Sequence, residues 1–139
     1  MKLVRLAKGR WEVLAVLDRR GRCPVLDFLD ELNGDLRPAR EFLNLSLRVY
    51  LPLEGPPTAS ANLCKPLGDG LFELRRQPKG PKPRVLFFYD GGHRIVCTNA
   101  FSKLEATPRS EVEHARSLRE QYFATKLRQE IEVVEEGAS

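Results

Sequence analysis

The sequence lacks the features that several protein classes require. No apolar run approaches the roughly 20 residues that a membrane-spanning helix needs, and the start Met1 to Arg5 is too short and too charged for a signal peptide. There are only three cysteines, without a CxxC pair, and only two histidines. Neither a disulfide framework nor a zinc site is therefore favoured. We expect a cytoplasmic protein with no metal, no other cofactor and no membrane partner, and a buried thiol at Cys97.

The balance of charge changes near the C-terminus, where Lys and Arg are absent. All 23 Lys and Arg lie at or before Arg128, whereas four of the 19 acidic residues follow it, so residues 1–129 carry a formal charge of +8. With 139 residues and 42% apolar residues, the chain can bury one ordinary core. We expect a single domain over 1–139 with an acidic extension at 129–139.

Cations are concentrated between Lys65 and Lys103. Eight of them share this segment with only three acidic residues. The cations are Lys65, Arg75, Arg76, Lys79, Lys82, Arg84, Arg94 and Lys103. Apolar runs typical of strands alternate with these charges, so the segment is suited to hold a polyanion, most commonly a phosphodiester backbone. The pattern indicates an RNA-handling surface.

The first half of the chain predicts one strand and two helices. Residues 11–17 are apolar enough for a first strand. Pro24 opens a helical stripe that Asn33-Gly34 stops, and a second stripe runs from Leu36 to Leu51 and should end at Pro52. The segment 52–62 has no periodicity and reads as a loop.

The second half predicts a three-stranded antiparallel meander and a long helix. The strands are expected at 71–76, 84–89 and 93–101. Thr107 should cap the helix, with Pro108 in its first turn, and an apolar stripe continues as far as Val134. The fold class is α+β, with a small antiparallel sheet with mixed edges, packed against an N-terminal helical hairpin and a C-terminal helix.

This order of elements resembles the RelE/ParE toxin superfamily, and particularly its HigB-type and phage-derived branch. The resemblance covers about 23–122 and rests on the following segments. They are the helix opening Pro24 to Leu29, Lys65-Pro66-Leu67, Gly70 to Arg75, Arg84 to Phe88, Phe101 with Lys103, and Thr107-Pro108 with Glu111 and Ala115. It implies a RelE-like fold and a metal-independent endoribonuclease that cuts mRNA on the ribosome. It also implies a cognate antitoxin, expected to be a helix-turn-helix protein.

The resemblance assigns the catalytic role to Arg75, Arg84 and Lys103. Cations directed at one phosphate stabilise the charge of the cleavage transition state, and the arginine fork binds two phosphate oxygens. Each residue also has a structural reading. Arg84 can be a solvated charge at the edge of a strand, Lys103 a surface lysine, and only one of Arg75 and Arg76 can face a given site.

Further RNA contacts are expected from residues around the same strands. They are Arg76, Lys79, Lys82, His93, Arg94 and Tyr122. His93 also fits an ordinary turn position and Tyr122 an ordinary core position. Phe88 and Phe101 read as core residues. Glu73 can be a general base, but a salt bridge to an arginine is favoured.

The chain departs from the family pattern after Lys103, because two lysines that are usual in relatives are missing before Thr107. Fewer phosphate contacts would weaken RNA binding. The alternative to a nuclease toxin is therefore a non-catalytic protein of the same fold that binds nucleic acid or protein, either a decayed toxin or a component of a phage or transcription complex. A gyrase-directed toxin of the ParE type fits the motifs less well.

Overall fold

A mixed β-sheet forms the centre of the protein in a computed structural model that describes residues 1–56, 64–75, 82–103 and 106–137. Within these residues the sheet has seven strands in the order β3-β4-β5-β6-β2-β1-β7. Their bounds are β1 (Lys2–Lys8), β2 (Glu12–Val16), β3 (Cys64–Gly68), β4 (Leu71–Leu74), β5 (Pro83–Asp90), β6 (Arg94–Ser102) and β7 (Glu132–Glu135). The pairs β2–β6 and β1–β7 are parallel, and the other neighbours are antiparallel.

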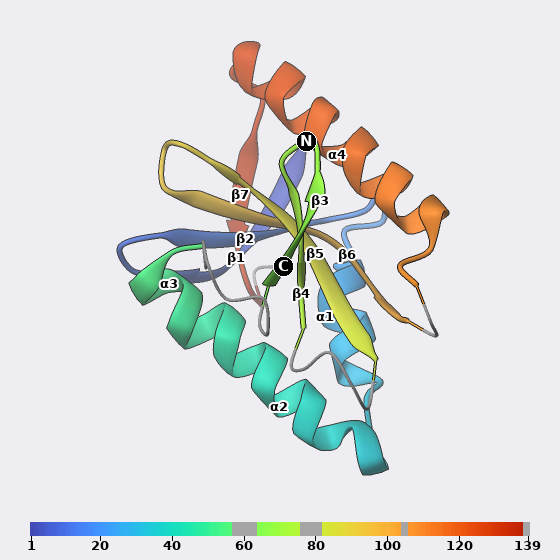
Figure 1. Ribbon diagram of the computed structural model, residues 1–139. Helices are drawn as coiled ribbons and strands as arrows, with labels where there is room; N and C mark the ends of the chain where they lie inside the picture. The colour runs from blue at the N-terminus through green and yellow to red at the C-terminus, as the bar shows by residue number, and fades with distance from the viewer. Residues whose placement is uncertain (57–63, 76–81, 104–105, 138–139) are drawn as a thin grey trace.

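Helices cover both faces of this sheet. The helical segments are α1 (Pro24–Asp30), the 3-10 turn η1 (Gly34–Leu36), α2 (Arg37–Leu45), the π-helical turn η2 (Ser46–Tyr50), α3 (Leu51–Glu54) and α4 (Arg109–Leu127). Figure 1 shows α2 and α4 on opposite sides of the strands. None of the helices in the described ranges is both long and apolar enough to cross a bilayer.

Two hydrophobic cores result, one on each face of the sheet. Val85 and Phe87 of β5 join the core beneath α1 and α2, whereas Leu86 and Phe88 join the core beneath α4. This alternation follows from the two-residue period of a strand, and burial on both faces explains why β5 is a continuous apolar run. Cys97 is fully buried, as expected, and so are Phe88 and, nearly so, Phe101.

The α+β fold class and the meander of β4, β5 and β6 are confirmed. The expected first strand at 11–17 is instead the second, since β1 precedes it. The strand β3 was not predicted. The prediction that the last helix continues along its apolar stripe to Val134 is wrong beyond Leu127. The chain turns at Gln129, with φ of 58°, and then forms β7.

Two expected helix signals are also corrected. Pro52 does not end the helical run but lies in the first turn of α3, where the missing N–H costs least, and the run continues to Glu54. Thr107 does not cap α4, since the N-cap position is Pro108 and has no side-chain cap. The Thr107 hydroxyl donates instead to Glu73 Oε2 over 2.7 Å.

Candidate functional site

Glu73 is the centre of a buried polar cluster on the sheet face that α4 covers. Its carboxylate is 0% exposed and lies 2.8 Å from Arg84 Nε and 3.5 Å from Lys103 Nζ. The hydroxyl of Thr107 provides a further hydrogen bond. The favoured salt bridge of Glu73 to an arginine is therefore confirmed. We call these four residues the Glu73 cluster.

The register of the strands brings the cluster together. Glu73 lies opposite Leu86, and Arg84 lies opposite Phe101. Alternation along β4 and β5 then turns the Glu73 and Arg84 side chains to the same face. Just after β6, the Lys103 N–H donates to the carbonyl of Lys82 over 2.7 Å, which fixes where its side chain begins.

The first turn of α4 is attached to the same part of the sheet. Asn99 Nδ2 of β6 donates to the Glu111 carboxylate over 2.6 Å and to its carbonyl oxygen over 3.2 Å. Thr107 and Asn99 thus hold the segment before α4 and its first turn against β4 and β6. This arrangement fixes the position of the helix relative to the cluster.

Arg75 lies close enough to affect the electrostatics of this cluster. Burial lowers the pKa of Arg84, the neighbouring Glu73 carboxylate raises it, and the Arg75 charge lowers it again, with a net lowering. Three cations and one carboxylate leave an excess of positive charge among Arg75, Arg84, Lys103 and Glu73. Of the three cations that the sequence singled out, Arg84 and Lys103 therefore pair with Glu73 directly, and Arg75 acts on Arg84 through its charge.

The three cations differ in how much solvent they reach. Arg84 is 1% exposed and Lys103 is 8% exposed, whereas Arg75 is half-buried. Lys82, just before β5, is also half-buried. Arg76 and Lys79 lie outside the described residues.

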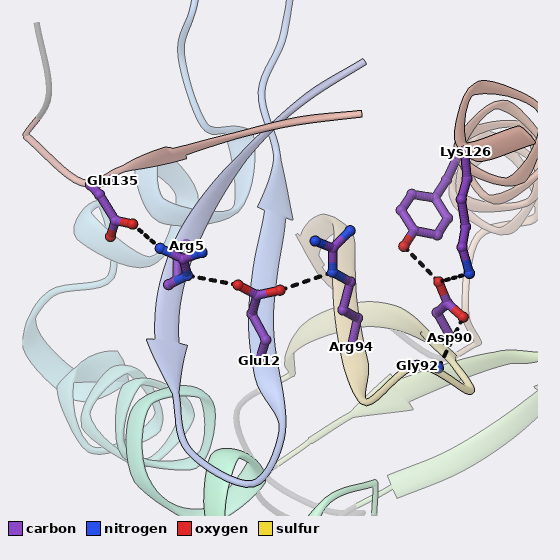
Figure 2. A network of polar contacts seen from close by, with 8 residues as sticks. Arg5, Glu12, Asp90, Gly92, Arg94, Lys126 and Glu135 are labelled. Carbon is purple, nitrogen blue, oxygen red and sulfur yellow. Dashed lines mark hydrogen bonds and ion pairs between the residues drawn. The ribbon is translucent and has the colours of Figure 1, made fainter. Parts of the chain in front are cut away.

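A second polar network lies at the other end of β5 and β6 (Figure 2). Arg94 Nε is 2.9 Å from Glu12 Oε1, and Arg5 Nε donates to Glu12 Oε2 over 2.7 Å. Arg5 also pairs with Glu135 of β7. Burial raises the pKa of Glu12, whereas the hydrogen bonds and the charges of Arg5 and Arg94 lower it. The lowering is the larger effect, so the pKa of Glu12 lies below its usual value. Arg94 thus belongs to a structural network across the four strands β6, β2, β1 and β7.

Tyr122 and His93 lie at this second end as well. Tyr122 is 0% exposed, and burial raises its pKa to about 12. His93 is exposed in the turn before β6, with its ring centroid 5.1 Å from that of Trp11. The run of β5 from Arg84 to Asp90 spans about 20 Å at the usual rise per residue. His93, Arg94 and Tyr122 are therefore not brought together with the Glu73 cluster.

Sequence reasoning missed Thr107 as part of the site, because it was assigned to a helix cap. The available signal was Glu73, a carboxylate within an apolar strand, which requires buried partners. The distance along the chain between Glu73 and Thr107 concealed the pairing.

Comparison with known proteins identifies a family. A search of curated proteins found no match. The family model described as phage-derived protein Gp49-like matches residues 27–120, a range that contains the whole Glu73 cluster and most of the previously noted resemblance. The chain therefore belongs to the Gp49-like family of phage-derived proteins, a toxin-like family related to the RelE/ParE-type toxins.

Proposed function

We propose that this protein is the toxin of a type II toxin-antitoxin pair, of the HigB-type branch, and that it cleaves mRNA on the ribosome without a metal. Its partner would be a small helix-turn-helix antitoxin, and its site of action the cytoplasm. The observation that carries the proposal is the pairing of Arg84 and Lys103 with the buried Glu73, next to the charge of Arg75, in a chain of a toxin-like family.

The chemistry requires an excess of positive charge at one phosphate. Cleavage by the neighbouring 2′-hydroxyl builds negative charge on the phosphate oxygens, and preorganised cations stabilise that charge strongly where water is excluded. In a surrounding of low polarity, each such contact is stronger than at an open surface. The Glu73 carboxylate holds two of the cations in place without cancelling the charge of all three.

Exposure divides the roles among the cations. Arg75 is half-buried and Lys103 lies at the edge of the cluster, so these two would contact the scissile phosphate. Arg84, at 1% exposure, would act as a positioning residue that orients Glu73 and adds charge at short range. Lys82, Arg76 and Lys79 would bind flanking phosphates of the message.

A second candidate function is supported by the same burial. Arg84 and Lys103 both pair with Glu73 and reach little solvent, as in a purely structural ion cluster. A protein of this kind would keep the fold and its basic surface and bind RNA or protein without cutting. Cleavage activity separates the two candidates.

The decisive experiment is primer extension on a message taken from a cell-free translation reaction. The intact protein should create new 5′ ends on translated message. Arg75→Ala and Lys103→Ala should reduce the cleavage rate by about a hundredfold or more, as expected when a donor to the transition state is lost. Arg37→Ala is the matched control, because it removes an exposed arginine from α2 on the other face of the sheet.

Arg84→Lys tests the positioning role, since it keeps the charge but loses the planar fork that faces Glu73. We expect a lower maximal rate with unchanged RNA affinity. Full-length message with the intact protein, under conditions where circular dichroism shows it folded, would refute the nuclease and favour the binding protein.

A further inference from the structure

The turn between β2 and α1 presents three exposed arginines. Asp18 Oδ1 accepts hydrogen bonds from the N–H groups of Arg20 and Arg22, over 2.8 and 2.9 Å, and the Asp18 N–H donates to the Arg22 carbonyl over 2.8 Å. Gly21, with φ of +80°, allows the chain to close this turn. The Asp18 carboxylate thus binds backbone N–H groups of the turn. Among the described residues, none of these arginines has an ion-pair partner.

A groove of about 540 Å³ lies beside this turn, between the end of β2 and α4. Its lining combines apolar, hydrogen-bonding and cationic side chains. Among them are Leu17 and Leu118, His114 and Gln121, and Lys2 and Arg19, and Asp18 lines the groove as well. Lys2 Nζ lies 3.9 Å from a carboxylate oxygen of Glu132 in an exposed ion pair. The volume is within the range of small-molecule sites, and the combination of apolar walls with a few polar groups is typical of them.

We propose that this groove binds one nucleotide of single-stranded RNA. Lys2 and Arg19 would bind its phosphate, because charge-assisted bonds from Lys and Arg suit that group. The base would pack against Leu17 and Leu118, with His114 and Gln121 available for hydrogen bonds. This inference rests on the proposed function and adds a second RNA contact outside the Glu73 cluster.

The groove lies on the same sheet face as the Glu73 cluster. Thr98 of β6 lines the groove, and Lys103 directly follows the end of β6. At the usual rise per residue of a strand, Thr98 and Lys103 are about 16 Å apart. His114 of the groove lies one helical turn after Glu111, which Asn99 anchors near the cluster. One RNA strand of a few nucleotides could therefore occupy both places.

Titration of the full chain with uridine monophosphate, followed by NMR, tests the proposal without any cleavage reaction. We expect saturable shifts of the amide signals of Arg19, Arg20 and His114. Arg19→Ala should weaken the affinity about tenfold, as for one lost hydrogen bond to a charged group. Arg37→Ala should leave it unchanged.

A second pair of variants tests the groove itself. Gln121→Trp adds bulk to an exposed groove position and should abolish the shifts, whereas Ala124→Trp introduces the same side chain at an exposed position of α4 outside the groove and should not. Equal affinity for inorganic phosphate would overturn the nucleotide assignment. Shifts confined to Lys103 and Thr107 would overturn the groove. Because the titration involves no cleavage, loss of nuclease activity alone would refute the proposed function and not this site.

Discussion

The hydroxyl of Tyr122 donates a hydrogen bond to Asp90 over 2.8 Å, which links α4 to the end of β5. The same Asp90 oxygen accepts from Lys126 Nζ over 2.7 Å, and the other carboxylate oxygen accepts from the N–H of Gly92 over 3.2 Å. Burial raises the pKa of Asp90, whereas these three donors and the Lys126 charge lower it. The lowering is the larger effect, so the pKa of Asp90 lies below its usual value. This contact therefore fixes the second half of α4, as Thr107 and Asn99 fix the beginning.

Tyr122→Phe should destabilise the protein by about 1 kcal/mol, the usual net value of one hydrogen bond. The ring would keep its packing against Phe88, whose centroid is 5.2 Å away. Urea unfolding measures the change. Tyr50→Phe is the control, because Tyr50 is 43% exposed, and it should leave the free energy of unfolding unchanged. Equal values for both variants would contradict the role of the Asp90 contact.

Glu73→Ala should destabilise the protein by about 3–5 kcal/mol, since it leaves the buried Arg84 without its counter-charge. The matched control is Glu113→Ala, which removes a carboxylate paired with the exposed Arg109. That change should stay within about 0.5 kcal/mol. Comparable losses in the two variants, measured by urea unfolding, would show that the Glu73 cluster contributes no more than a surface pair.

Stability should fall in acid. The folded pKa values of Glu12 and Asp90 lie below their usual values of 4.5 and 3.8. Such groups stabilise the folded state fully above the usual values, and the contribution is lost as the pH falls through the lower folded values. The thermal midpoint should therefore hold down to pH of about 5 and decline below about 4.5. Asp90→Asn should flatten the decline, and an unchanged slope would contradict this assignment.

Gly55→Ala should destabilise the protein by more than about 2 kcal/mol, because positive φ costs an L residue about 1–2 kcal/mol and a clash adds to it. Gly55 has φ of +81°, and an added Cβ would lie 2.4 Å from Trp11 Nε1. Gly91→Ala provides the comparison, since nothing lies within 4 Å of its Cβ position. Thermal unfolding of the two variants should differ clearly, and coincident midpoints would disprove the close packing against Trp11.

The parts of the fold that could be predicted are those with a strong local pattern. The strands β4, β5 and β6 have apolar runs separated by turn residues, and the helix stripes after Pro24 and Pro108 are regular. The edge strands were missed for a physical reason. Residues 132–135 are short and acidic, and they become a strand only through pairing with β1, which lies far away in the sequence.

The charged residues of the candidate site could be predicted from the sequence, but their burial could not. Charge counting identified Arg75, Arg84 and Lys103, and the position of Glu73 within a strand indicated a salt bridge. Nothing local indicates that Arg84 is 1% exposed, because its burial depends on residues from other parts of the chain, such as its partner Glu73 on β4. For the same reason, the separation of His93 and Arg94 from the cluster could not be inferred from residue type.

The parallel pairing of β2 with β6 also determines when the protein can fold. Ala15 of β2 is opposite Cys97 of β6, and Leu3 of β1 is opposite Val133 of β7. The N-terminal hairpin of β1 and β2 therefore lacks both neighbouring strands until β6 and β7 have been synthesised. Pairings so distant in sequence are slow to form, because loop closure precedes the gain from contact. The sheet can therefore close only after residues 132–135 have been synthesised, and until then a nascent chain exposes the unpaired edges of its N-terminal hairpin.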